Sequence, residues 1–152
     1  MTTRFKSSAI ILLFSFMMTL LPVSAYAVEE NETETYTYVE DLGNDFTVKT
    51  TLTIAPEQAR TSSKRATKIQ VIEHRDREIA TVKLIATFSY DGTTARVTST
   101  SYEKDTALGW LYARHNITTS GGRATLTADL ISAIGTVPIN ITIRCTPAGV
   151  IT

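Results

Sequence analysis

The stretch that decides the fold is Thr81–Tyr90, TVKLIATFSY, followed by Asp91-Gly92 and then by Thr93–Tyr102, TTARVTSTSY. Apolar side chains recur at alternate positions in both runs, which is the period of a β-strand with one buried face. Asp-Gly between two such runs favours a two-residue hairpin turn, because both central positions need a positive φ. The pattern predicts an antiparallel hairpin in which Phe88 faces Ala95.

The same alternation recurs along most of the remaining chain, where threonine and β-branched residues favour strands over helices. The further segments that we expect to form strands are Tyr36–Leu42, Phe46–Ile54, Thr67–Ile72, Leu108–Thr118, Ala124–Leu130 and Val137–Cys145. The polar stretch Glu57–Ala66 predicts a loop or an exposed helical turn. Pro138 cannot donate to a ladder, so we expect the last strand either to lie at a sheet edge or to begin at this residue.

This spacing of strands and turns predicts an all-β protein. Seven to eight short strands imply a single antiparallel β-sandwich of immunoglobulin-like size. The alternative is a single sheet closed into a β-barrel. The sandwich is favoured because half-apolar strands need one covered face and tolerate one solvated face.

The first 27 residues have the three parts of a secretory signal peptide. Arg4 and Lys6 form a basic head before an uncharged apolar run, and Ala25 and Ala27 supply the small residues that a signal peptidase reads. We therefore expect residues 1–27 to be removed and the mature protein to be secreted and extracellular.

Beyond the signal peptide, we expect residues 28–35 to form an acidic mobile lead-in and residues 36–152 to form the β-sandwich domain. Removal of Arg4 and Lys6 from a chain with 15 basic and 15 acidic residues leaves a mature domain with a slight negative charge. That charge gives no attraction to nucleic acid. The mature region also lacks an apolar run of the roughly 18–20 residues that a membrane span needs. Its single cysteine, Cys145, rules out an internal disulfide and is expected to be buried in the last strand.

The chemically reactive side chains form no recognisable catalytic or metal-binding motif, so we assign no catalytic residue, cofactor or metal. The Glu73–Glu78 charge run carries arginines among its carboxylates and predicts a solvated hairpin tip. A secreted hydrolase would need two carboxylates in one cleft, within about 5–10 Å of each other. Its candidate carboxylates are Glu40, Asp41, Glu103 and Asp105.

Aromatic side chains give the candidate binding residues. Trp110 and Tyr112 share one face of a strand whose other face, with Leu111, is also apolar. One interpretation is that Trp110 anchors the core. The other is that Trp110, Tyr112 and Tyr102 form an exposed platform, which would bind sugar rings or a partner protein through flat apolar faces.

Together with the signal peptide, the Phe88–Gly92 turn and the terminal Ile143–Gly149 segment resemble small exported β proteins of Gram-positive bacteria. The resemblance implies no activity and no site residue. The function expected from the sequence is a secreted, non-enzymatic interaction module for cell-wall polysaccharide or another extracellular protein. The alternatives are a small-ligand carrier built as a closed barrel and, third, a secreted hydrolase.

Overall fold

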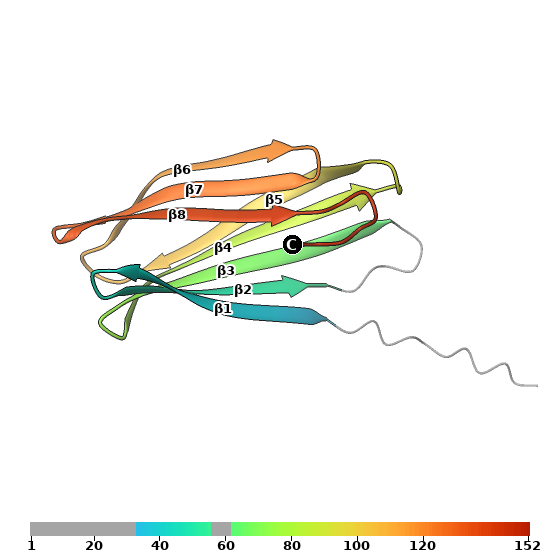
Figure 1. The fold of residues 1–152 in the computed structure, drawn as a ribbon. Helices are drawn as coiled ribbons and strands as arrows, with labels where there is room; N and C mark the ends of the chain where they lie inside the picture. The colour runs from blue at the N-terminus through green and yellow to red at the C-terminus, as the bar shows by residue number, and fades with distance from the viewer. Residues whose placement is uncertain (1–32, 56–61) are drawn as a thin grey trace, which may run out of the picture.

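The computed structural model describes residues 33–55 and 62–152, and within these segments all regular structure is β-strand (Figure 1). The eight strands are β1 (Glu34–Gly43), β2 (Phe46–Ile54), β3 (Ser63–His74), β4 (Arg77–Tyr90), β5 (Ala95–Thr106), β6 (Leu111–Ser120), β7 (Arg123–Ser132) and β8 (Gly135–Arg144). They form two antiparallel sheets, one in the order β1-β2-β3-β4-β5 and the other in the order β6-β7-β8. The predicted all-β sandwich is confirmed. The closed barrel is wrong, because the chain divides its strands between two open sheets.

All eight predicted strands are present, although several begin or end a few residues away from the predicted positions. Two of these differences extend strand pairing into segments that we expected to be irregular. β1 begins at Glu34, so strand pairing extends into the segment that we expected to be a mobile lead-in. β3 begins at Ser63 rather than Thr67, because Ser63–Ala66 pairs with the end of β4. Residues 1–27, most of the lead-in and residues 56–61 lie outside the described segments. Those segments contain no helix long and apolar enough to cross a membrane.

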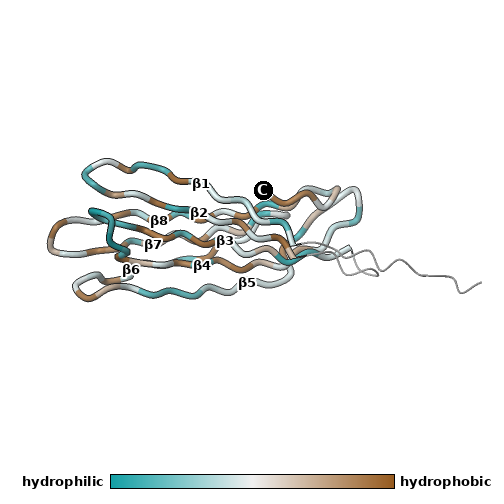
Figure 2. Tube along the Cα trace, turned by 90° about the horizontal axis from the view of Figure 1, so that it is seen from below, coloured by the Kyte–Doolittle hydropathy of each residue, from teal (hydrophilic) through white to brown (hydrophobic). Residues whose placement is uncertain are grey.

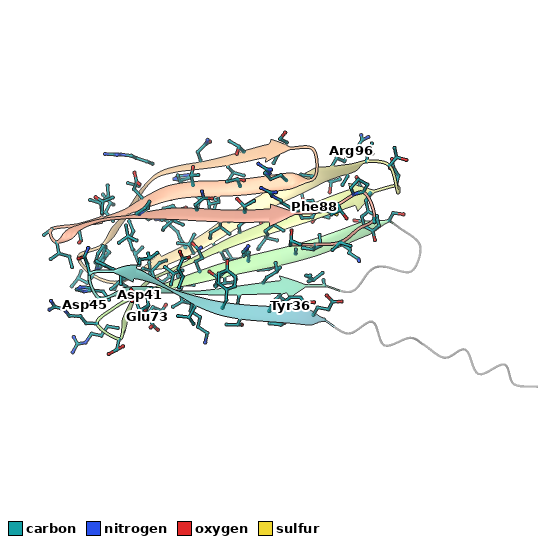
Figure 3. The ribbon with its side chains drawn as sticks, viewed as in Figure 1. Tyr36, Asp41, Asp45, Glu73, Phe88 and Arg96 are labelled. Carbon is teal, nitrogen blue, oxygen red and sulfur yellow. The ribbon has the colours of Figure 1, made fainter. Side chains whose placement is uncertain are left out.

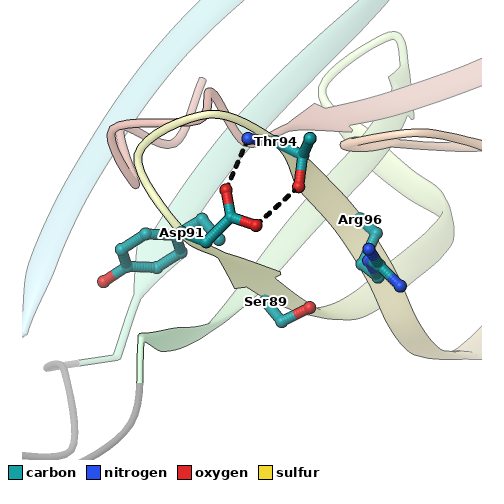
Figure 4. A pocket seen from close by; sticks show the side chains of 5 residues that line it. Ser89, Asp91, Thr94 and Arg96 are labelled. Carbon is teal, nitrogen blue, oxygen red and sulfur yellow. Dashed lines mark hydrogen bonds between the residues drawn. The ribbon is translucent and has the colours of Figure 1, made fainter.

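The β4–β5 hairpin is present, but the predicted register is wrong. Phe88 faces Val97 instead of Ala95, because the connection has four residues rather than two. The Asp91 carboxylate accepts hydrogen bonds from the Thr94 amide and hydroxyl, at 2.6 and 2.9 Å, which stabilise the wider turn (Figure 4). A bulge at Thr98 then shifts the rest of β5 by one further residue.

The three-stranded sheet covers only part of the five-stranded one. Its strands contact β3, β4 and β5, whereas β1 contacts only β2 among the described strands. β1 and β5 are therefore the two edges of the wide sheet, and β1 lies at its uncovered edge (Figure 2). The largest fully buried apolar side chains lie between the sheets and are Phe88, Ile72, Leu84, Leu126, Leu130, Ile141, Ile143 and Val82.

Side chains of β3 attach the edge of β8 to the wide sheet. Lys68 Nζ donates to the carbonyl oxygen of Thr142 at 3.0 Å, and Gln70 Nε2 donates to that of Asn140 at 3.4 Å. Thr152 exchanges two backbone hydrogen bonds with Arg144 on the same edge. Pro138, in the strand that we expected at an edge, lies in β8, which is indeed an edge strand.

The β6–β7 turn closes one end of the sandwich. Gly122 accepts a hydrogen bond from the Cys145 amide at 2.7 Å, and Gly121 accepts one from the Val97 amide at 2.9 Å. A Cβ at position 122 would overlap the carbonyl oxygen of Cys145 and the side chain of Ala95. The turn thus holds β5 and the end of β8 together by close backbone approach.

We expect Gly122→Ala to lower the free energy of unfolding by about 2–4 kcal/mol, because the added methyl meets backbone that cannot move independently. Gly121→Ala is the matched control, since it adds the same methyl next door, where the nearest atom is 3.8 Å away, at a φ of +52°. That strain costs about 1–2 kcal/mol. Urea unfolding of both variants measures the difference, and equal losses would show that the turn does not hold the end of the sandwich closed.

Candidate functional site

Two of the predicted binding residues, Tyr102 and Tyr112, lie together at the seam between β5 and β6. Their rings are stacked with centroids 6.1 Å apart, and His115 stacks on Tyr112 at 5.7 Å. The Tyr102 hydroxyl and His115 Nε2 form a hydrogen bond of 2.9 Å. Tyr112 is only 6% exposed and belongs to the core. The interpretation that places Tyr112 in an exposed platform is therefore wrong, and these rings close the gap between the two sheets.

A β-bulge brings His115 into this seam. Arg114 and His115 together face one residue of β7, between the pairs Ala113–Asp129 and Asn116–Thr127. Arg114 has a φ of +51°, which reverses the normal alternation. The sequence offered no glycine or proline to signal this bulge, so we assigned His115 no role.

Trp110 lies apart from the two tyrosines. It precedes β6 in the loop after β5, and its ring is perpendicular to that of Phe46, with centroids 6.0 Å apart. Phe46 in turn stacks on His74 at 4.5 Å. Trp110 is half-buried against the core, which agrees with the anchor interpretation, whereas Leu111 is 62% exposed.

The candidate carboxylates of a hydrolase lie on opposite edges of the wide sheet. Glu40 and Asp41 are in β1, and Glu103 and Asp105 are in β5. Four strand spacings separate these edges, or about 19 Å. Glu103 also pairs with Lys83 at 2.6 Å. The fold does not bring the two pairs into one cleft.

Cys145 and the potential metal ligands show no arrangement for catalysis or metal binding among the described residues. Cys145 is buried, as expected, and burial raises the pKa of its thiol. Within the described segments, no group of three or more His, Cys, Asp or Glu side chains is arranged to hold a metal ion.

A small hollow lies beside the β4–β5 turn (Figure 4). It measures about 200 Å³ and is lined by Ser89, Tyr90, Asp91, Thr94 and Arg96. Hydrogen bonds from Thr94 and Thr93 lower the pKa of Asp91, so its carboxylate is already engaged in holding the turn. The hollow is smaller than the roughly 300–1,000 Å³ of typical small-ligand sites.

Among the described residues, the most accessible aromatic side chains are on β1, and they were not among the binding residues predicted from the sequence. Tyr36 is 55% exposed and Tyr38 is 49% exposed. They are paired with Leu52 and Thr50 of β2, so they lie on the face of the sheet that packs against the smaller sheet farther along. The smaller sheet does not reach β1, and every residue of this strand is exposed. The signal was the alternation Tyr36-Thr37-Tyr38, which we used only to place a strand.

The hydrogen bonds of β2 identify which backbone groups of β1 have no partner in the described structure. The Ala55 amide donates to Arg65, and the Arg75 amide donates to Asp45, so odd-numbered residues along β2 bond to β3. Even-numbered residues of β2 therefore bond to β1. The N–H and C=O groups that point away from the sheet belong to four residues, Thr35, Thr37, Val39 and Asp41. Their side chains lie on the opposite face from Tyr36 and Tyr38.

The other edges in the described structure carry features that hinder strand addition. β5 has the bulge at Thr98 and Lys104 on the same face as Tyr102, and β6 has the bulge at Arg114. β8 has Pro138 and the contacts to β3 described above. In β1 the only register shift lies beside its turn, and its ten residues include no lysine, arginine or proline. It is the edge best suited to accept another strand.

Comparison with known proteins gives no assignment: no family, curated protein or solved structure matches this chain.

We expect Tyr112→Phe to change the pH dependence of stability. Burial, with a smaller contribution from Tyr102, raises the pKa of Tyr112 to about 12. The unfolded tyrosine ionises near pH 10, so its contribution to stability is present below pH 10 and is lost between about pH 10 and 12. Urea unfolding at pH 9 and 11 should show a smaller loss in the variant than in the wild type. An equal loss would contradict this assignment.

At neutral pH the same substitution tests the buried hydroxyl. The Tyr112 hydroxyl has no hydrogen-bond partner among the described residues. Tyr112→Phe should therefore leave stability unchanged or raise it by up to about 1 kcal/mol. A loss of more than about 1 kcal/mol in the free energy of unfolding would mean that the hydroxyl forms a hydrogen bond.

Tyr102→Phe should lower the free energy of unfolding by about 0.5–1 kcal/mol, through loss of its bond to His115. His115→Phe gives the second arm of a double-mutant cycle, and the double variant the third. Urea unfolding measures the coupling, and a coupling energy of zero would show that this bond does not hold the seam.

Proposed function

We propose that this protein is a secreted, non-enzymatic interaction module that binds another extracellular protein, and that the partner contributes a strand which pairs with β1. The observation that carries the proposal is the unprotected edge of β1. Four residues of this exposed edge strand direct backbone groups outward, and these groups have no partner among the described residues. Main-chain hydrogen bonds at such an edge supply affinity, and side chains at alternate positions supply selectivity.

The exposed side chains of Tyr36 and Tyr38 also support this proposal. An added strand would continue the face on which they lie and would cover part of their exposed area. Tyrosine is enriched at protein interfaces because its ring supplies a large contact area at little entropic cost. The partner would thereby extend the core side of the sheet past the point where the three-stranded sheet ends.

The site suits a strand better than the other ligands that we considered from the sequence. Cell-wall polysaccharide would need the aromatic faces of Tyr36 and Tyr38 but would leave the backbone row of β1 unused. The carrier would need the closed barrel, which the fold does not form. The hydrolase would need its carboxylates in one cleft, and they lie on two separate edges.

The test uses residues 28–152, which contain all eight strands. Random peptides of about ten residues are displayed on phage, selected on this protein, and then measured individually by fluorescence anisotropy. We expect selected peptides to bind with dissociation constants of about 1–100 μM, as is usual for small, transient interfaces.

The decisive variant is Val39→Pro, with Val39→Thr as its matched control. Proline removes an outward-facing N–H and leaves the β1–β2 bonds in place, because edge strands tolerate proline at such positions. Val39→Pro should weaken peptide binding at least about tenfold, and Val39→Thr should not. Circular dichroism and thermal unfolding check that both variants fold.

Two outcomes would overturn the proposal. One is that no peptide is enriched, or that enriched peptides bind Val39→Pro as well as the wild type. The other is co-sedimentation with cell-wall polysaccharide that survives Val39→Pro and is lost in Tyr36→Ser/Tyr38→Ser. That second pattern would assign the surface to glycan instead.

A further inference from the structure

We infer that the strand accepted by β1 is cationic, and that the same charge prevents β1 from pairing with a second copy of itself. This inference rests on the proposed strand addition and specifies the chemistry of the partner. The inference is based on the position of three carboxylates beside the row of outward-facing backbone groups on β1. Those carboxylates belong to Glu34, Glu40 and Asp41.

The carboxylates lie where side chains of an added strand would contact them. Glu34 and Glu40 lie on the same face as Tyr36 and Tyr38, one at each end of the tyrosine pair. Asp41 lies on the other face and belongs to the outward-facing row. All three are exposed, and none forms an ion pair with another described residue. A strand with basic side chains at matching positions would meet a carboxylate on each face.

Further acidic groups surround the turn end of β1. Asp41, Asp45 and Glu73 gather there, whereas Tyr36 lies toward the other end of the strand (Figure 3). A hollow at this turn is lined by Asp41, Asp45 and Asp76 together with Arg75. Arg75 is bound to Asp45 at 3.2 Å, so part of its charge is already compensated. The acidic character of β1 therefore continues past its end.

The cations nearest to β1 leave this character in place. Lys68 approaches the ring of Tyr38 at 6.0 Å, but its ammonium group donates to the carbonyl of Thr142. Lys49 lies opposite Val39 on the face away from the tyrosines. On the tyrosine face of β1 itself, the charged side chains are Glu34 and Glu40 alone.

The same charges disfavour self-pairing. Two antiparallel copies of β1 would bring six carboxylates into one ladder, with no basic side chain in either strand. Like charges across a strand pair are destabilising, and this repulsion selects against the one partner that is always present at equal concentration. An edge without bulge, proline or lysine can thus remain open to a basic strand without joining copies of the protein.

The first experiment compares three synthetic peptides of about ten residues that share an alternating Thr–Val background. Each has the same three positions occupied by lysine, glutamine or glutamate, and both ends are blocked. We expect the lysine peptide to bind at least about tenfold more tightly than the glutamine peptide at low salt, and the glutamate peptide to bind weakest. The advantage of lysine should shrink between 20 and 300 mM salt.

The matched variant is Glu34→Gln/Glu40→Gln/Asp41→Asn, which keeps the shapes and the Asp41 side-chain acceptor for the Gly43 amide. It should bind the lysine and glutamine peptides within about twofold of each other. Hydrogen exchange should show protection of the Thr37 and Val39 amides in the complex. Val39→Pro should weaken the binding of both peptides at least about tenfold.

Failure of the charge inference and failure of the proposed function give different results. Equal binding of lysine and glutamine peptides to the wild type, lost in Val39→Pro, would overturn cation selection and leave strand addition standing. No binding of any peptide, including those selected by display, would overturn strand addition itself.

Sedimentation provides an independent arm. The wild type should remain monomeric, and the neutralised triple variant should self-associate at least about tenfold more strongly, an effect that added Val39→Pro reverses. A triple variant that stays monomeric at the same concentrations would overturn the inferred role of the carboxylates against self-pairing.

Discussion

The position of the small sheet on the large one depends on hydrogen bonds from β3 side chains to the backbone of β8. Lys68 and Gln70 point toward the core side of β3, where apolar residues would otherwise be expected, and they occupy carbonyl groups on the free edge of β8. Those bonds satisfy an edge that has no neighbouring strand. They also place the boundary of the small sheet above β3, so two strands of the large sheet extend past it.

Because the small sheet ends above β3, side chains on β1 and β2 differ in burial. The core-side residues of β2, such as Val48 and Leu52, are still buried, whereas their partners in β1 are exposed. A strand in this position contributes pairing to β2 but has no layer above it. Its tyrosines therefore lie on an exposed surface that is aromatic, as protein interfaces are, and that belongs to an edge strand with no second layer over it.

The sequence predicted the strands well because most of them alternate over six or more residues, and burial of one face enforces that period. It predicted register and contacts poorly. The width of the β4–β5 turn depends on where the Asp91 carboxylate bonds, and Asp-Gly is compatible with more than one turn. The bulges at Thr98 and Arg114 occur at residues with no special backbone preference, and they redirect every side chain beyond them. Tyr112 and Trp110, which share a face by simple alternation, end up in different neighbourhoods for the related reason that β6 starts only after Trp110.

The binding surface that we propose on β1 was not predicted from the sequence, for a different reason. Amphipathic patterning marks Tyr36 and Tyr38 as core-facing, and in a sandwich with two equal sheets they would be. Whether such a strand is covered depends on how many strands the opposite sheet contains, which is a property of the whole topology and not of the segment. The acidic residues of β1 are the local signal that remains, because charges of a single sign on an exposed edge strand disfavour pairing with a second copy and favour a strand of the opposite sign. The same three carboxylates would be unremarkable solubilising groups on a strand whose backbone was fully paired. Their proposed role in binding depends on their position beside the outward backbone groups of Thr35, Thr37 and Val39, which have no partner in the described structure.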